Sequence, residues 1–230
     1  MSSAIALAML ALSACSPANQ TPAATESAPA ADVTEDEGGH GGVLLPQMVC
    51  GPDAFIKQDV TKASLIATHG AENVTEETVP WADSEETAVV LFANNPAMRV
   101  LLFWLGETTG GPAHVSVSGE ETQFIGPKGI IMGATLEDVE AANGGPFMLM
   151  GFENHNSGEA GNWLGGALAT PDGGTCFQRM TFDLPEDTPA DIRAKVSGDP
   201  DKSYRSDSPE MRAAKPVVVE MSIGYAKSPS

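Results

Sequence analysis

The chain has 230 residues, which suits one large domain or two small ones. Its hydrophobic content of 42% and its 24 glycines favour a globular, strand-rich core. The formal net charge is −19, from 31 acidic and 12 basic side chains, and so acidic a surface repels phosphate backbones. We therefore expect no nucleic-acid partner.

An uncharged apolar run occupies residues 4–14. The run is too short to span a bilayer, which needs about 20 apolar residues. A brief apolar run that ends in small residues is typical of a secretory signal peptide, although the basic residues that usually precede it are absent from Met1-Ser2-Ser3. The pattern predicts a signal peptide over residues 1–14.

Cys15 follows this run directly and indicates a particular kind of signal peptide. The sequence Leu12-Ser13-Ala14-Cys15 resembles the lipobox of bacterial lipoproteins, whose signal is cleaved before the cysteine and whose cysteine is then acylated. The resemblance implies lipidation of Cys15 and a membrane anchor, and Ser16 in place of an aspartate implies the outer membrane. The alternative is an ordinary cleaved signal in which Cys15 is a chance residue.

Residues 15–42 have the composition of a flexible tether. They are rich in Pro, Ala, Thr, Ser, Glu and Gly and contain almost no large apolar side chain. Such a segment cannot bury enough surface to offset the entropy lost on ordering it, so we expect it to be disordered. As a flexible coil it would hold the folded part, from residue 43 onward, on the order of 30 Å from the lipid headgroups.

Two cysteines, Cys50 and Cys176, are left once Cys15 is set aside. In an oxidising compartment outside the cytosol two thiols favour a disulfide, and the chain has no C-x-x-C spacing that would indicate a metal or redox site. The sequence therefore predicts a Cys50–Cys176 disulfide. The alternative is two buried free thiols.

Two segments of the folded part share one spacing of apolar, threonine and glycine residues. In each, a threonine suited to a helix N-cap precedes an apolar residue and then a glycine suited to the helix end. The matching positions are Ile56, Val60, Thr61, Leu65 and Gly70 in the first segment and Ile130, Ala134, Thr135, Val139 and Gly144 in the second. Asp138 follows Thr135 as the acidic member of a capping box would. The spacing predicts one short amphipathic helix in each segment.

Each of these helices is followed by segments with the alternation and turn residues of antiparallel strands. The expected strands are Thr87–Ala93, Arg99–Leu105, His114–Ser118 and Thr122–Ile125 in the first half, and Phe147–Glu153, Asn162–Leu168, Cys176–Leu184 and Val217–Tyr225 in the second. The sequence thus predicts an α+β fold of two tandem helix–antiparallel β-meander repeats, over residues 43–127 and 128–230. An insertion over 185–216 interrupts the second repeat and should contain a short helix around Pro189–Val196 and then an acidic loop.

The second predicted helix carries a family resemblance. Its residues fit the spacing I-x-x-G-x-T-x-x-x-V-x-x-x-x-G-x-P, through Ile130, Gly133, Thr135, Val139, Gly144 and Pro146. This spacing resembles that of small outer-membrane lipoprotein A and the barrel-assembly accessory lipoproteins, and tandem copies of the unit resemble the β-lactamase inhibitor protein fold. The first half departs from the pattern, with Asp59 where a glycine is expected and Glu72 where a proline is expected. The resemblance implies a non-enzymatic lipoprotein that binds envelope proteins or inhibits an enzyme, and it transfers no contact residue.

Aromatic residues are scarce, and five side chains stand out as candidate binding residues. They are Trp81, Phe103, Trp104, His155 and Trp163. Aromatic rings exposed on a sheet are natural anchors for a protein partner, while His155 sits at an expected hairpin tip where a ligand could bind. The alternative for the aromatic residues is simple packing in the core. The chain has neither G-x-S-x-G nor H-E-x-x-H, and we predict no catalytic residue, metal or cofactor.

The insertion contains a cluster of acidic residues, Asp199, Asp201, Asp207 and Glu210. Calcium prefers several carboxylate and carbonyl oxygens, so this loop could collect a cation. The spacing does not match an EF-hand and basic residues intervene, which favours a solvated loop instead.

Together these patterns predict a non-catalytic lipoprotein of the bacterial outer membrane with a protein-binding domain. The expected partner is an envelope assembly component or an enzyme that the protein inhibits. The alternative is a periplasmic enzyme, or a protein that binds a small ligand or a cation, with its site near His155 and Trp163. An aromatic sheet face would favour the first hypothesis, and a pocket lined by converging His, Asp and Glu side chains would favour the second.

Overall fold

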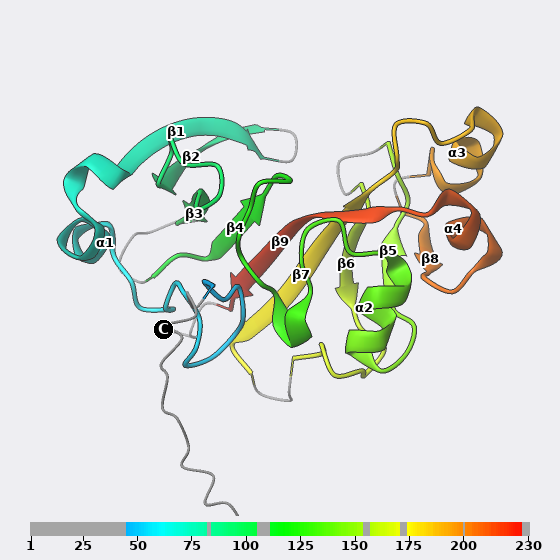
Figure 1. Ribbon diagram of the computed structural model, residues 1–230, viewed down its shortest axis with the longest axis horizontal. Coiled ribbons are helices and arrows are strands. Elements are labelled where there is room, and N and C mark those ends of the chain that lie inside the picture. Colours follow the sequence, from blue (N-terminus) through cyan, green and yellow to red (C-terminus); the bar gives the residue numbers. More distant parts are fainter. Residues whose placement is uncertain are drawn as a thin grey trace, which may run out of the picture. The chain divides into compact units, whose positions relative to one another are not determined.

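Nine antiparallel strands in the described part of the chain form one sheet, in the order β1-β2-β3-β4-β9-β7-β6-β5-β8 (Figure 1). The computed structural model describes residues 45–81, 84–104, 111–153, 157–170, 174–199 and 201–226. The strands are β1 (Val74–Trp81), β2 (Ser84–Leu91), β3 (Val100–Phe103), β4 (His114–Ser118), β5 (Met148–Met150), β6 (Glu159–Asn162), β7 (Cys176–Asp183), β8 (Ser203–Arg205) and β9 (Val217–Tyr225). The helices are α1 (Lys62–His69), α2 (Leu136–Asn143), α3 (Ala190–Val196) and α4 (Pro209–Ala214), with the 3-10 turns η1 (Ala71–Asn73) and η2 (Pro127–Gly129). This mixed architecture confirms the expected combination of helices with an antiparallel sheet; the expected signal peptide, Cys15 and the tether lie outside the described residues.

Strands β4 and β9 form the middle of the sheet and join the earlier strands to the later ones. Their pairing runs from His114 opposite Gly224 to Ser118 opposite Glu220. On its other side β9 pairs with β7, the longest partnership in the second half of the chain. Because β9 is the last strand, the two parts of the sheet are joined only once the C-terminal segment is in place.

The two predicted capped helices are confirmed residue for residue at their caps. Thr61 precedes α1 and accepts a hydrogen bond from the backbone N–H of Ser64, and Thr135 precedes α2 and accepts one from Asp138. In both cases the third residue of the helix bonds back to the threonine N–H, which completes a capping box. Gly70 and Gly144 end the two helices, as the sequence indicates.

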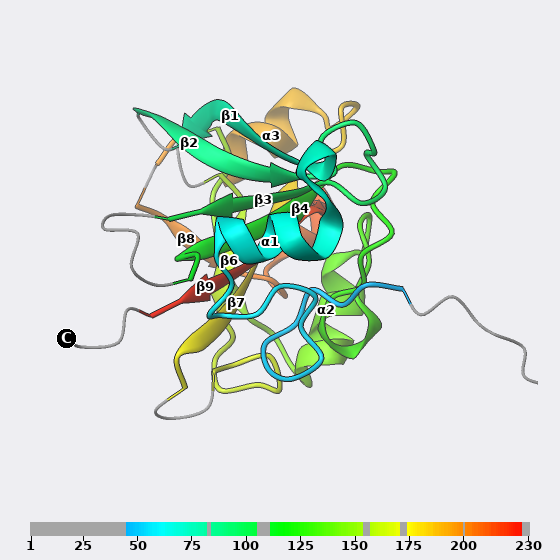
Figure 2. The same ribbon diagram turned by 90° about the vertical axis from the view of Figure 1, so that its left-hand side faces the viewer.

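Residues Val43–Ser230 form one compact unit, and its described residues share one large hydrophobic cluster. Alternate residues of a strand point to opposite faces of a sheet. In β2, Val89 and Leu91 belong to the large cluster, whereas Ala88 and Val90 belong to a second, small cluster. The buried apolar residues of the described helices all belong to the large cluster, and α1 lies against this side of the sheet (Figure 2). We call this side the helix-covered face and the opposite side, with Ala88 and Val90, the second face.

Two of the expected strands are wrong. Residues 122–125 form no strand, and only Ile125 makes an isolated bridge, with Gln47. Residues 163–168 form turns, while β6 lies earlier in the chain. The buried amide of Asn143 organises these turns, because its Oδ1 accepts from the N–H of Leu168 and its Nδ2 donates to the carbonyl of Trp163. The apolar residues at the ends of this loop are therefore buried without any strand.

Two strands and one helix were not expected from the sequence. Strand β1 reads VTEETVPW, is mostly exposed and lies at one edge of the sheet, so it has little apolar alternation to detect. Strand β8 and helix α4 lie in the insertion expected as an acidic loop. The short helix expected around Pro189–Val196 is confirmed as α3.

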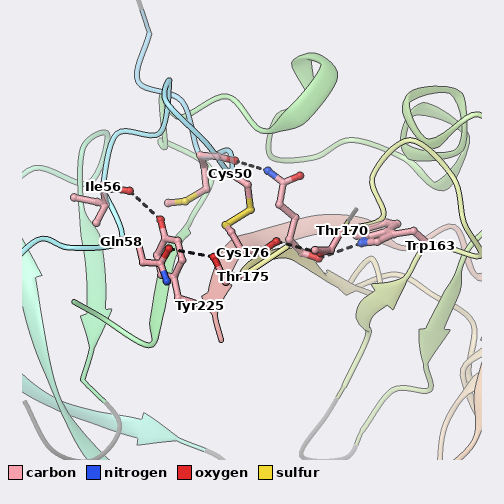
Figure 3. The surroundings of a disulfide bond; sticks show 10 residues. Cys50, Ile56, Gln58, Trp163, Thr170, Thr175, Cys176 and Tyr225 are labelled. Atoms are coloured by element: carbon pink, nitrogen blue, oxygen red, sulfur yellow. Dashed lines mark hydrogen bonds between the residues drawn. A yellow bond between two sulfur atoms is a disulfide. The ribbon is translucent and has the colours of Figure 1, made fainter. Parts of the chain in front are cut away.

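The expected disulfide is confirmed and fastens the N-terminal part of the folded unit to the sheet (Figure 3). Cys50 and Cys176 have Cα atoms 5.8 Å apart, and both pack against the large hydrophobic cluster. Beside the disulfide, the hydroxyl of Tyr225 donates to the carbonyl of Ile56 at 3.0 Å. The segment before α1, which forms no helix or strand of its own, is thereby held against β7 and β9.

Candidate functional site

The second face carries the candidate site, and strand register decides which of its side chains are neighbours. Directly paired residues of adjacent antiparallel strands point to the same face of a sheet. Three rows of such residues cross the middle strands β4, β9 and β7. They are His114, Gly224 and Phe177; Ser116, Ser222 and Arg179; and Ser118, Glu220 and Thr181. Phe103 of β3 continues the first row, and Glu159 of β6 continues the third.

Trp81, Phe103 and His114 gather at one end of the first row and are called the aromatic corner. The ring centroids of Trp81 and Phe103 are 4.3 Å apart, and those of Trp81 and His114 are 4.9 Å apart. Phe103 is only 3% exposed, whereas Trp81 and His114 are partly exposed. Trp81 and His114 are therefore the rings of this corner that a ligand can touch, and Phe103 supports them from within.

His114 is held neutral in this corner. Burial lowers the pKa of its imidazole to about 4, and the positive charge of Arg179 acts in the same direction. At pH 7 the ring therefore carries no charge. It contributes packing area and hydrogen-bonding capacity to the aromatic corner, but no attraction for an anion.

Small residues occupy the centre of the second face. Ser116 and Ser222 are paired with each other, and each is 5% exposed. Gly224 lies against the ring of Phe177, because a Cβ atom at position 224 would be 2.0 Å from Phe177 Cε2. Any larger residue at 224 would therefore displace this ring.

A hollow of about 480 Å³ opens on the second face beside Phe177. Met148 and Met150 of β5 line it together with the ion pair between Arg179 and Glu159. In this pair Arg179 Nη1 donates to Glu159 Oε1 at 2.8 Å, and the guanidinium lies 5.1 Å from the centroid of the Phe177 ring. The hollow thus combines flexible apolar side chains with one ion pair, a lining that suits an apolar side chain with a polar neighbour.

Glu220 is the one charged group in the three middle rows other than Arg179. Burial raises the pKa of its carboxyl to about 7, and the nearby negative charge of Glu159 contributes to the rise. Among the described residues this carboxylate has neither a hydrogen-bond partner nor an ion-pair partner. The Glu220 oxygens are not among the buried atoms that lack a hydrogen-bond partner, so the second face presents a carboxylate that water reaches but no described cation pairs with.

Of the four candidate binding residues within the described ranges, Trp81 and Phe103 come together in the site. Trp104 instead packs, partly buried, against the large cluster. Trp163 is a core residue at 3% exposure, its Nε1 donating to the carbonyl of Gln178 at 3.1 Å, so its ring has no free face for a ligand. His155 lies outside the described residues.

Sequence reasoning missed the charged and apolar residues of β7 and β9 that make up the rest of the site. Arg179 and Phe177 alternate along β7 with residues that face the core. Both strands lie almost at their expected bounds, and the alternation of β7 read for the face opposite the core identifies these two residues. Glu220 is harder to assign, because the pairing skips Val219 and this irregularity interrupts the alternation between the core residues Val218 and Met221.

The acidic loop is not gathered around a common point. Asp207 forms an ion pair with Arg205, and the side chain of Asp199 accepts a hydrogen bond from the backbone N–H of Asp201. Across the described ranges, no group of three or more His, Cys, Asp and Glu side chains is placed to hold a metal ion. Those same ranges contain no helix with the length and apolar character needed to cross a membrane.

A larger hollow, of about 850 Å³, lies along α2. Its walls are mostly glycine, alanine and aliphatic residues from the segment 129–134 and from the helix, and Ile131 there is 55% exposed. It contains no pair of groups suited to catalysis, since its charged lining residues are only Lys128 and Asp138, and Asp138 is engaged in the α2 capping box.

Comparisons of the chain with protein-family models, with curated proteins and with solved structures find no match.

Proposed function

We propose that this protein is a non-catalytic lipoprotein of the bacterial envelope that binds another envelope protein through the second face of its sheet. The observation that carries the proposal is the second face itself, where the aromatic corner and the 480 Å³ hollow lie on strands that the described helices leave uncovered. Protein-binding sites typically concentrate their energy in a few aromatic and arginine side chains. Trp81, Phe177 and Arg179 supply such residues across one continuous sheet.

The uneven packing of the sheet favours this proposal. One face supports nearly all of the buried apolar residues, while the other has only a small cluster of Ala88, Val90 and Phe103. Polar and small side chains, such as Ser116 and Ser222, separate the aromatic corner from the hollow. An extended surface with anchors at both ends suits a protein segment better than a small substrate, which would need a single enclosed pocket.

We also propose that the two halves of the folded part are tandem copies of one helix–meander unit. Support comes from the strand order, in which β1-β2-β3-β4 meets β9-β7-β6-β5, so that the last strand of each half pairs with the other. Each half would then consist of one threonine-capped helix and four antiparallel strands, with β8 and two helices in the insertion. An experimentally solved structure would test this: α1 with β1–β4 should superpose on α2 with β5, β6, β7 and β9, and a failure to superpose would refute the duplication.

The membrane anchor and the outer-membrane location are proposed from the sequence around Cys15. Mass spectrometry of the protein from native membranes should find a diacylated or triacylated N-terminal Cys15. Cys15→Ser should release the protein from the membrane fraction, whereas the matched change Ser16→Ala should not. An unmodified N-terminus that begins at Met1 would contradict the proposal.

Site-specific photocrosslinking in the native host tests the binding face. A benzoylphenylalanine in place of Thr181, on the second face, should capture a discrete envelope protein from the full lipidated chain. The same residue in place of Ile66, which is 37% exposed on α1, is the matched control on the helix-covered side. Trp81→Ala should weaken capture from position 181. Capture from position 66 alone, or no captured protein at either position, would contradict the proposal.

A further inference from the structure

The second face has an excess of negative charge that its own cations do not neutralise. Arg179 is already paired with Glu159, and Arg99 with Glu77 at 2.8 Å. His114 in the same region is neutral at pH 7, because burial lowers its pKa to about 4. Among the described residues of this face, Glu220 therefore has no cation of its own.

The neighbours of Glu220 in its row show where a cation would fit. On β9 it is flanked by Ser118 of β4 and Thr181 of β7, neither of which is charged, and beyond Thr181 lies Glu159. The two carboxylates thus lie at opposite sides of a threonine in one row. Glu159 also lines the 480 Å³ hollow, so the negative site and the apolar hollow are contiguous.

We infer that the partner of the second face inserts a lysine or arginine side chain against Glu220, with an apolar side chain seated in the adjoining hollow. This inference rests on the proposed function and specifies its partner: a protein segment with a basic residue next to an apolar one. A divalent metal ion fits less well, because the described residues offer no group of three carboxylate, imidazole or thiolate ligands. A basic side chain needs only the carboxylates present.

Binding of a cation to Glu220 has a characteristic pH dependence. The carboxyl must be ionised to attract a basic side chain, and its raised pKa of about 7 leaves it largely protonated at pH 6 and largely ionised at pH 8. If only the ionised form binds, affinity should rise about tenfold from pH 6 to pH 8. A lysine or arginine does not titrate in this range, and neither do Ser118 and Thr181. Glu159 belongs to an ion pair with Arg179.

The test uses the isotope-labelled full chain and two synthetic peptides, acetyl-Gly-Leu-Lys-Leu-Gly-amide and the same peptide with norleucine in place of lysine. We expect the lysine peptide to bind at least fivefold more tightly, and to shift the amide resonances of Ser118, Thr181 and Glu220. Glu220→Gln should weaken its binding about tenfold at pH 8 and abolish the rise between pH 6 and pH 8. The matched change Glu210→Gln, at an exposed position of α4, should alter neither the binding of the lysine peptide nor its pH dependence.

Thr181→Lys provides an independent test in case Glu220→Gln changes the local packing. Thr181→Lys supplies an ammonium group between the two carboxylates and should displace the lysine peptide with the sheet intact. Equal binding of the two peptides, unchanged binding by Glu220→Gln, or shifts confined to other residues would overturn the inference. If neither peptide binds while crosslinking from position 181 captures a protein, the inference fails and the proposed function stands; if the peptide binds but no protein is captured, the proposed function fails instead.

Discussion

The two faces of the sheet are built from the same strands but differ in how much apolar surface they bury. On the helix-covered face, residues such as Val89, Leu102 and Val115 join one cluster with residues of the helices. On the second face the neighbouring residues Val90, Leu101 and Ser116 meet only a small apolar cluster, polar groups and a hollow. The helix-covered face therefore buries most of the apolar surface that stabilises the fold. The second face can in turn carry groups that do not stabilise it, such as the carboxylate of Glu220, which has no described cation as a partner.

The largest expected loss of stability comes from the disulfide, which belongs to the helix-covered side. Replacing both Cys50 and Cys176 by serine should lower the free energy of unfolding by up to about 4–5 kcal/mol, because the bond closes a very long loop in the unfolded chain. Urea titration of the variant against the oxidised protein measures the difference. Adding a reductant to the unmodified protein should produce the same loss, and a stability that no reductant changes would show that the disulfide contributes nothing.

Substitution of two adjacent leucines of β3 compares how much each face contributes to the free energy of unfolding. Leu102 is fully buried in the large cluster, and Leu102→Ala should cost about 3 kcal/mol by leaving a cavity. Leu101 is partly buried and packs on the small cluster, so Leu101→Ala should lower the free energy of unfolding by only about 1 kcal/mol. Chemical unfolding of the two variants gives both values. Equal losses would mean that the second face is as much a part of the core as the first.

Glu220 should destabilise the folded protein at neutral and alkaline pH. Its pKa is about 7 in the folded protein and near the ordinary value of 4.5 in the unfolded chain, so the folded state holds the proton more tightly. The free energy of unfolding that depends on Glu220 is therefore highest below about pH 4.5, falls as the pH rises to about 7, and is constant above that. Glu220→Gln, which cannot ionise, should be more stable than the unmodified protein by up to about 3 kcal/mol at pH 8.

Melting temperatures of both proteins at pH 4 and pH 8 measure this effect. His114 is present in both, so its own titration cancels in the difference between them. Its lowered pKa acts in the opposite direction, since the stability it supports is lost as the pH falls from about 6.5 toward 4. A difference between the two proteins that does not change with pH would exclude a raised pKa for Glu220.

The smallest expected effect concerns the helix caps. Thr135→Ala removes the hydroxyl that accepts from the N–H of Asp138 at 3.2 Å, and should cost about 1 kcal/mol. Thr135→Ser keeps the hydroxyl and should cost less than half as much. Thermal unfolding distinguishes the two. Since α2 packs on the helix-covered face, neither change should alter peptide binding on the second face.

Much of the fold could be predicted from local patterns. Strands β4 and β9 and the caps of α1 and α2 follow from alternation, N-cap threonines and terminal glycines, which act within a few residues of each other. The failures occurred where distant contacts override such signals. The apolar residues around Leu168 look like a strand but are held in turns by Asn143, and β1 lacks apolar alternation because it is a largely exposed edge strand.

The candidate site was predicted only in part, for a related reason. Trp81 and Phe103 were recognised as unusual aromatic residues, yet nothing local indicates that they meet His114, or that Trp163 is buried. Arg179 and Glu220 become neighbours of the site only because β7 and β9 pair in one register. A shift of that register by one residue would move both to the opposite face.

Composition, helix caps and strand alternation are thus enough to predict the acidic character of the chain, the elements with clear local signals, and the pair of cysteines available for a disulfide. The order of the strands, the face on which each side chain lies, and the separation of Glu220 from the described cations of its face depend on contacts made only in the folded protein. The two groups of features differ in the sequence separation of the residues that interact. Caps and alternation depend on neighbours along the chain, whereas burial and charge pairing depend on strands that lie far apart in sequence and meet only in the folded sheet.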